Sequence, residues 1–322
     1  MQSTTESPDM ITASELKPER QLMGHQFSTY RIGGPIEEAY QPASVEEAVA
    51  VLQNIYQKDG IQKPLTVLGW GGNTLIASAG ISGLTLITRK MTWVHPLGNF
   101  RFEFGAGVHL AKVAATALQQ SLTGAEFTIG IPGTVGGAIR MNAGAMRQET
   151  QNVIASVTLY NLEKRQLETW EPEALGFAYR KSNIDPQKVV VLSAVMGFEK
   201  GDKDQIKAKM DENVQFRKSH HPIEPNGGSV FQNPLPDKPA GMLLDKLGAK
   251  SWVEGGVRIS PLHANFIINH DNGSSLDVLR LMRRMQLAIW EHYQLSTHPE
   301  NKFMGDATAE EASLWQALTQ AP

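Results

Sequence analysis

The chain has 322 residues, of which 41% are apolar and 20% are charged, and its formal net charge is −3; these values are typical of a soluble globular protein with two or three domains. Such a charge balance argues against a nucleic-acid partner, and no apolar run is long enough to insert into a membrane. Cysteine is absent and the nine histidines show no metal-ligand spacing, so we expect no disulfide and no metal site. No signal peptide is recognisable, and we expect a cytoplasmic monomer.

The first part of the chain combines a polar tail with helix and strand patterns. Residues 1–20 are polar and aperiodic, which predicts a flexible tail. A helix is predicted over 42–60, because Ser44 and Glu47 have capping-box spacing and apolar residues recur on one face. A short buried strand follows and runs into a first glycine-rich segment, GWGGNTLI at 69–76.

This segment partly fits the dinucleotide fingerprint GxGxxG. Gly69 and Gly71 occupy the first two glycine positions, but Thr74 stands at the third, and the residues that follow are strand-like instead of helical. The pattern therefore argues against a Rossmann domain.

The next elements continue a mixed helix and strand pattern. Strands are predicted over 84–90 and 101–107, and a helix stopped by Gly124 over 109–124. The second glycine-rich segment follows at 130–145, and two more strands are predicted over 157–160 and 189–199.

The character of the chain changes near residue 200, where helices and a proline-rich loop predominate. Helices are predicted over 201–222, 239–248 and 274–294, and a strand, turn and strand over 255–269. We therefore predict an α+β fold with one domain over 21–200, a second over 201–306, and a tail or short helix over 307–322.

The second glycine-rich segment, GIPGTVGGAIRMNAGA at 130–145, has few large side chains. Glycine destabilises an ordered segment by about 0.5–1 kcal/mol relative to alanine. Either tight turns or close approach of backbone amides to an anion explains its use here. A plain structural loop is the alternative.

Several motifs in a fixed order resemble one enzyme family. The motifs are TYRIGG at 29–34, LGWGGNTLI at 68–76, GIPGTVGGAIRMNAGA at 130–145, YRKS at 179–182, GSVFQNP at 228–234, HANFIIN at 263–269 and PENKFMG at 299–305. In this set the chain resembles the UDP-N-acetylenolpyruvoylglucosamine reductase family over residues 22–306.

The resemblance implies an FAD-binding α+β domain of the vanillyl-alcohol-oxidase (PCMH) type in two subdomains, followed by a C-terminal α+β substrate-binding domain. It also implies reduction of UDP-N-acetylglucosamine enolpyruvate to UDP-N-acetylmuramate for the peptidoglycan cell wall. FAD is expected to be bound without a covalent link, and NADPH is expected as co-substrate.

The resemblance assigns catalytic roles to three residues. Arg180 is expected to bind the substrate carboxylate, Ser229 to donate the proton, and Glu300 to assist protonation. Around Glu300 the match is looser, because Asn301 stands where an aliphatic residue is expected. Glu291 and Asp306 are less suitable candidates for the same role.

The two glycine-rich segments are expected to bind the FAD diphosphate through their backbone. The predicted cofactor-binding residues are Gly69, Gly71, Gly72, Asn73, Thr74, Ile131, Pro132, Gly133, Thr134, Gly136, Gly137 and Asn142.

The predicted substrate contacts are Tyr179, Asn233 and Lys250, and Arg217 and Lys218 are alternatives to Lys250 for the UDP diphosphate. We expect His263 to pack beneath the site. Because Ser229 follows Arg180 by only 49 positions, the chain resembles the shorter subtype, which lacks an inserted tyrosine loop.

Two other functions compete with this interpretation. One is an FAD-dependent oxidase of the same fold that acts on a sugar or alcohol, and the other is a non-catalytic regulator that binds a UDP-sugar or flavin. The presence of Arg180, Ser229 and Glu300 together favours the reductase.

Overall fold

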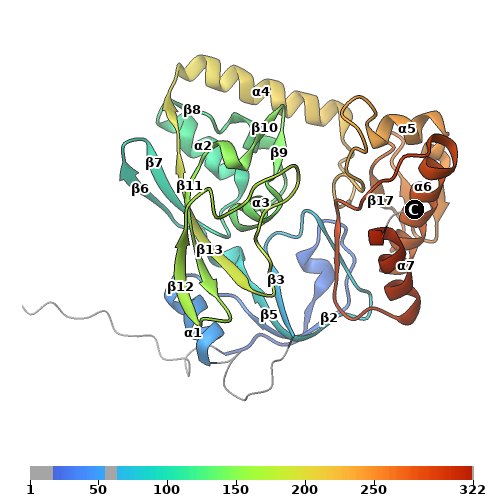
Figure 1. The fold of residues 1–322 in the computed structure, drawn as a ribbon, viewed down its shortest axis with the longest axis horizontal. Coiled ribbons are helices and arrows are strands. Elements are labelled where there is room, and N and C mark those ends of the chain that lie inside the picture. Colours follow the sequence, from blue (N-terminus) through green and yellow to red (C-terminus); the bar gives the residue numbers. More distant parts are fainter. Residues whose placement is uncertain (1–16, 55–63, 321–322) are drawn as a thin grey trace, which may run out of the picture.

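The computed structural model describes residues 17–54 and 64–320, which form an N-terminal and a C-terminal region joined by the long helix α4 (Lys203–His220) (Figure 1). Most of the tail predicted over 1–20 lies outside the described residues. Within them, Glu19 exchanges two backbone hydrogen bonds with Ala39.

The N-terminal region begins with a four-stranded sheet in the order β1-β2-β5-β3. Strands β2 and β3 run parallel to β5, and β1 is antiparallel to β2. Helix α1 (Val45–Asn54) starts at the predicted cap, because the Ser44 hydroxyl accepts a hydrogen bond from the Glu47 amide at 3.2 Å. The strands are Leu22–Met23 (β1), Pro35–Tyr40 (β2), Leu65–Leu68 (β3) and Ile81–Ile87 (β5).

A five-stranded antiparallel sheet follows, in the order β12-β11-β13-β7-β6. Its side chains pack with α2 (Leu110–Gln119) and α3 (Val135–Met141) in one core, and with α1 and the first sheet in another. The strands are Val94–Gly98 (β6), Arg101–Gly105 (β7), Ile154–Asn161 (β11), Gln166–Trp170 (β12) and Val189–Gly197 (β13). Two short pairs complete the region: Leu122–Thr123 (β8) with Glu199–Lys200 (β14), and Gly144–Ala145 (β9) with Gln148–Glu149 (β10).

Helix α3 differs from the expectation of a glycine loop over 130–145. The two adjacent glycines lie within its first turn, and Gly136 packs against Ala106, where an added Cβ would meet the Ala106 Cβ at 3.2 Å. The glycines here permit close packing of a short helix on its neighbour. Only Gly130 to Thr134 precede the helix as irregular or 3-10 chain.

The C-terminal region is built around α6 (Ser275–Tyr293), whose apolar face lies in a core that also includes Tyr30, Ile32 and Leu75 of the N-terminal region. Around it lie α5 (Ala240–Lys246), α7 (Ala309–Gln320) and the three-stranded sheet β15-β16-β17 (Figure 1). The strands are Val253–Glu254 (β15), Val257–Ile259 (β16) and Ile267–Asn269 (β17). The residues predicted as a tail or short helix over 307–322 thus include α7, which packs on α6.

The last strand returns to the N-terminal region. Strand β18 (Lys302–Met304) pairs in parallel with β4 (Thr74–Ile76), which forms the end of the first glycine-rich segment. This pairing brings the PENKFMG motif against the GWGGNTLI motif. Across the described ranges, no helix is long and apolar enough to cross a membrane.

Candidate active site

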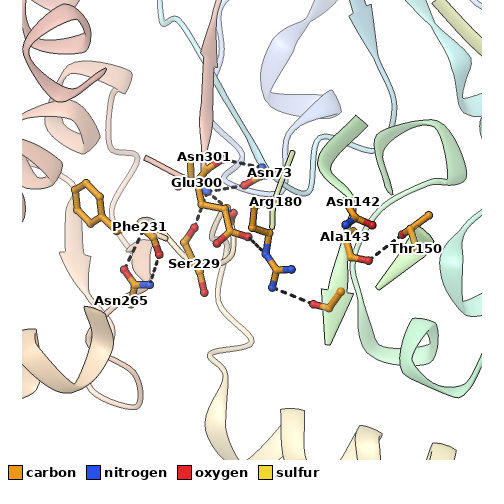
Figure 2. Close-up of polar contacts among 12 residues, drawn as sticks. Asn73, Asn142, Ala143, Thr150, Arg180, Ser229, Phe231, Asn265, Glu300 and Asn301 are labelled. Carbon is orange, nitrogen blue, oxygen red and sulfur yellow. Dashed lines mark hydrogen bonds and ion pairs between the residues drawn. The ribbon is translucent and has the colours of Figure 1, made fainter. Parts of the chain in front are cut away.

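Arg180 lies at a tight turn that directs its side chain toward the C-terminal region. Ala178 and Lys181 exchange backbone hydrogen bonds across the turn, and Arg180 has a positive φ of 56°. Its Nε donates to Glu300 Oε1 at 2.9 Å, and its Nη2 donates to the Gly144 carbonyl at 3.1 Å (Figure 2). The guanidinium is therefore fixed in direction, and its remaining donors, which make no hydrogen bond with the residues that the structure describes, can bind an anion.

Glu300 precedes β18 and is anchored through its backbone. Its amide donates to the Val230 carbonyl at 2.8 Å, which places it beside the segment that carries Ser229. Burial raises the pKa of the Glu300 carboxyl, and this effect outweighs the lowering by Arg180 and Lys302. A carboxyl of this kind retains a proton at a higher pH than an exposed glutamate does.

Ser229 is half-buried, between Glu300 and the C-terminal region (Figure 2). Its carbonyl accepts a hydrogen bond from Asn301 at 3.1 Å. Its hydroxyl makes no hydrogen bond within the part of the chain that the structure describes, so it is available to a ligand. The structure thus brings together the three residues predicted to be catalytic.

Asn301 joins the segments around the site through its side chain, a role that the sequence reasoning did not identify. It is 1% exposed, and its amide nitrogen donates to Asn73 Oδ1, the Gly227 carbonyl and the Ser229 carbonyl at 2.7–3.1 Å. Its oxygen accepts from the Tyr30 hydroxyl at 2.8 Å. The sequence did show that an amide stands at position 301, where an aliphatic residue was expected. In the structure this amide forms a polar junction between the two regions.

Asn73 and Asn142 use their side chains within the protein. The Asn73 amide nitrogen donates to the Glu300 carbonyl at 2.9 Å, and the Lys302 amide donates to the Asn73 carbonyl. The Asn142 side chain donates to Glu149 and to the Ala178 carbonyl, and it accepts from the Gln151 amide. Both side chains therefore hold segments that carry residues predicted to be catalytic, and any contact of these residues with a cofactor remains a prediction.

The two glycine-rich segments pack directly on each other. A Cβ at Gly72 would lie 2.4 Å from the Pro132 carbonyl oxygen, and one at Gly69 would lie 2.6 Å from the Thr134 hydroxyl. A Cβ at Gly71 would lie 2.0 Å from the Phe27 carbonyl oxygen. Only glycine permits this approach, which keeps the backbone of both segments free of side chains.

Polar groups in these segments fit an anionic cofactor. The Thr134 hydroxyl is buried and has no hydrogen-bond partner among the described residues, so it can donate a hydrogen bond to a ligand. The amides of Gly72, Gly133 and Gly137 also make no hydrogen bond within the described ranges. Gly133 has open space on its Cβ side.

Several of the predicted cofactor-binding residues use their backbone amides within the protein, among them Ile131, Gly136 and Thr74. The Ile131 amide donates to the Thr128 carbonyl at 3.2 Å, and the Gly136 amide donates to the Ala106 carbonyl at 2.9 Å. The Val135 amide likewise donates to the Val108 carbonyl at 2.9 Å. The expectation that the backbone of this segment binds the diphosphate is therefore wrong for the amides of Ile131, Val135 and Gly136. Pro132 has no amide hydrogen and contributes its carbonyl to the packing against Gly72. Thr74 begins β4, and its amide donates to the Gly71 carbonyl.

The predicted substrate contacts lie in different surroundings. Tyr179 is 49% exposed, with its ring centroid 5.0 Å from the Arg180 guanidinium carbon. Asn233 Oδ1 accepts a hydrogen bond from the Ala240 amide at the start of α5, and its Nδ2 makes no hydrogen bond with the described residues. Lys250 forms an ion pair with Asp245 at 3.0 Å.

The structure also distinguishes among the residues predicted as alternatives to Lys250 for the diphosphate and to Glu300 for protonation. Arg217 is largely buried, and its pKa is lowered by burial and by the nearby Arg180, whereas Lys218 is exposed on α4. Glu291 is exposed on α6, and Asp306 accepts a hydrogen bond from Ser82. No group of three or more metal-ligating side chains occurs in residues 17–54 and 64–320.

Comparison with known proteins agrees with this geometry. Residues 37–164 match a family model for an FAD binding domain, and residues 219–304 match one for the C-terminal domain of UDP-N-acetylenolpyruvoylglucosamine reductase. The UDP-N-acetylenolpyruvoylglucosamine reductase of Synechocystis sp. is 38% identical over 304 residues, or 92% of each chain. The protein of the same name from Halalkalibacterium halodurans is 32% identical over 307 residues, which cover 95% of this chain and all of that one.

A solved structure also has the same fold. The crystal structure of UDP-N-acetylenolpyruvylglucosamine reductase from Thermus caldophilus matches with a TM-score of 0.76 and 29% identity, over 89% of this chain and 99% of that chain. The predicted fold class, an FAD-binding domain followed by a C-terminal reductase domain, is confirmed by these matches.

Proposed function

The chain belongs to the UDP-N-acetylenolpyruvoylglucosamine reductase family, FAD-dependent oxidoreductases of peptidoglycan precursor synthesis, and we propose that it reduces UDP-N-acetylglucosamine enolpyruvate to UDP-N-acetylmuramate with NADPH. The chemistry that bound FAD supplies is hydride transfer, from NADPH and then to the methylene carbon of the enolpyruvyl ether. The Thr134 hydroxyl and the amides of Gly72, Gly133 and Gly137 would hold its diphosphate.

Arg180 binds the carboxylate of the enolpyruvyl group. Its Nε is occupied by Glu300 and one Nη by the Gly144 carbonyl, so the guanidinium is preorganised before the substrate arrives. Negative charge grows on the enolate side of the substrate during reduction, and a fixed cation stabilises that charge more than it stabilises the ground state.

Ser229 donates the proton to the carbon beside the carboxylate. A serine hydroxyl is a weak acid, so its conjugate oxygen needs stabilisation from neighbours and exclusion of water. The hydroxyl is not used within the described structure, and the backbone on both sides is held by Asn301 and Asn265. Its position is therefore fixed while its proton remains available.

Glu300 assists that proton transfer. Its raised pKa makes it a better proton reservoir than an exposed carboxylate, and its ion pair with Arg180 fixes its direction. The observation that carries the proposal is this ion pair, because it joins two of the three predicted catalytic residues across 120 positions of sequence.

Flavin absorbance tests the proposal directly. Under anaerobic conditions, NADPH should bleach the yellow colour of the purified FAD-bound protein, and UDP-N-acetylglucosamine enolpyruvate should restore it with formation of UDP-N-acetylmuramate. Reoxidation by oxygen with a sugar or alcohol as substrate, and no response to the enolpyruvyl compound, would support the oxidase instead.

We also propose that one chain acts alone in the cytoplasm. The contacts among Arg180, Glu300, Asn73, Ser229 and Asn301 all form within one chain, and those of Arg180 and Asn73 with Glu300 join its two regions. The molecular mass in solution, measured by light scattering with FAD bound, tests this proposal.

A further inference from the structure

Beyond the catalytic residues, Arg89 binds three backbone carbonyls in and beside the first glycine-rich segment. It lies in the 3-10 turn Thr88–Lys90, directly after β5. Its Nε donates to the Gly69 carbonyl at 3.2 Å, and its Nη2 donates to the Trp70 carbonyl at 3.0 Å. Its Nη1 donates to the Gln26 carbonyl at 3.0 Å. Within the described ranges, the hydrogen bonds of this guanidinium go to backbone carbonyls alone.

Aromatic rings hold the guanidinium in place. Its central carbon lies 4.7 Å from the centre of the Phe27 ring and 4.4 Å from that of the Trp70 ring, distances typical of cation–π contacts. The Trp70 ring in turn contacts the His109 ring at a centroid distance of 4.2 Å. His109 pairs through its backbone with Thr134 of the second glycine-rich segment. The stack of side chains therefore connects the guanidinium to both glycine-rich segments.

Three consecutive peptide groups of the first glycine-rich segment have their carbonyls occupied by the protein. Arg89 binds the first two. The third, the Gly71 carbonyl, accepts from the amides of Thr29 and Thr74 and from the Thr29 hydroxyl, at 3.2–3.3 Å. No peptide bond among the described residues is cis, so the N–H of each group points away from its carbonyl. The direction of these N–H groups is therefore fixed from the carbonyl side.

The N–H groups opposite these carbonyls belong to Trp70, Gly71 and Gly72, and none of them makes a hydrogen bond within the described residues. Gly71 has a φ of 73°, and such turns direct successive amides toward a common anion. The unpaired Thr134 hydroxyl lies beside the same segment, because a Cβ at Gly69 would be 2.6 Å from it. The segment therefore presents a run of unused donors.

We propose that Arg89 is a positioning residue for FAD, because it holds the carbonyls of Gly69 and Trp70 away from the cofactor diphosphate and so presents the opposite amides to it. The inference rests on the proposed function for its cofactor, and it adds a residue that lies outside both glycine-rich segments. Without the guanidinium, these peptide groups can rotate and direct a carbonyl oxygen at the diphosphate. Binding FAD then includes the cost of reordering them. Lysine cannot replace the planar fork that serves several carbonyls at once.

The fluorescence of released flavin tests the inference. Dilution of the FAD-bound protein releases cofactor, and the rise in flavin fluorescence gives the Kd for FAD. Arg89→Met keeps a long side chain and removes all three donations, and it should weaken FAD binding by about 10-fold or more. Arg89→Lys keeps the charge without the fork, and its Kd should lie between those of the wild type and Arg89→Met.

Two further measurements separate a positioning role from general damage. At saturating FAD, the rate of bleaching by NADPH reports distortion of the site itself, and Arg89→Met should change the Kd for FAD much more than this rate. Arg101→Met makes the same change at the exposed start of β7 and should leave the Kd for FAD unchanged. Melting temperature at saturating FAD establishes that each variant is folded. If Arg89→Met does not fold, Arg89→Lys decides, and wild-type affinity in that variant overturns the inference.

The outcomes also separate this inference from the proposed function. A Kd for FAD in Arg89→Met within about 2-fold of the wild type, or equal losses in affinity and in bleaching rate, overturns the positioning role even if the enzyme reduces its substrate. A raised Kd with the bleaching rate largely retained supports the role of Arg89. If the enolpyruvyl compound does not reoxidise the flavin in that same protein, the proposed reaction is overturned and the role of Arg89 stands.

Discussion

Replacing Asn301 by leucine should destabilise the protein strongly, although leucine has a similar size and the site is 1% exposed. The change removes four hydrogen-bond partners. Two of them, the Tyr30 hydroxyl and the Gly227 carbonyl, lie in buried contacts that water does not reach. Asn73 and Ser229 are only partly buried.

Each buried polar group left without a partner costs about 1–3 kcal/mol, and removal of the buried asparagine amide offsets part of this cost. We therefore expect Asn301→Leu to lower the free energy of unfolding by about 3 kcal/mol. Urea unfolding of the FAD-bound protein measures this loss. Asn152→Leu makes the same change at an exposed position, where it removes one hydrogen bond, from the Glu149 amide, and should cost about 1 kcal/mol.

A double-mutant cycle with Tyr30→Phe isolates the junction itself. Tyr30→Phe alone leaves the Asn301 oxygen unpaired, whereas in the Asn301→Leu background it removes a hydroxyl that has already lost its acceptor. The double variant should therefore be at least about 1 kcal/mol more stable than the sum of the single changes predicts. Additivity within about 0.5 kcal/mol, or an Asn301→Leu variant as stable as the wild type, would refute the reasoning.

Other predictions concern the reaction and the cofactor. Ser229→Ala should leave bleaching by NADPH unchanged and slow reoxidation by substrate by about 10²–10⁴-fold in stopped-flow absorbance; near-normal reoxidation would exclude Ser229 as the proton donor. Because burial raises the pKa of Glu300, the reoxidation rate should fall as pH rises through a range above the usual carboxyl value of about 4.3, and Glu300→Gln should remove that step from the pH profile. Gly72→Ala places a methyl 2.4 Å from the Pro132 carbonyl oxygen and should lower FAD content, measured by absorbance after purification. A Cβ at Gly137 would lie 3.8 Å from its nearest neighbour, so Gly137→Ala should retain more FAD than Gly72→Ala if the steric clash causes the loss.

The sequence predicted best what depends on local pattern. Strong apolar periodicity over 274–294 predicted α6 (Ser275–Tyr293) to within a residue or two at each end. The capping spacing of Ser44 and Glu47 marked the start of α1 correctly. In contrast, α3 was missed because its glycines disfavour a helix locally, and packing against Ala106 outweighs that preference.

The geometry of the site depended on contacts that no local pattern encodes. The motifs named Arg180 and Glu300, but their ion pair spans 120 positions and follows from the tertiary fold. Asn301 was treated as a departure from the expected aliphatic residue, because its four partners come from three distant segments. The sequence likewise could not predict that some backbone amides, such as that of Gly136, are bonded within the protein and cannot bind the cofactor, because this depends on how helix α3 packs.

The pairing of β18 with β4 also determines how late in protein synthesis the contacts around the first glycine-rich segment can form. Asn73 finds its acceptor on Glu300 only after a further 227 residues have been synthesised, which takes about 10–45 s at roughly 5–20 residues per second. During that time the first glycine-rich segment lacks its final strand partner. Stable retention of FAD is therefore tied to synthesis of almost the whole chain, and a product interrupted before β18 would carry the cofactor motifs without the contacts that fix them.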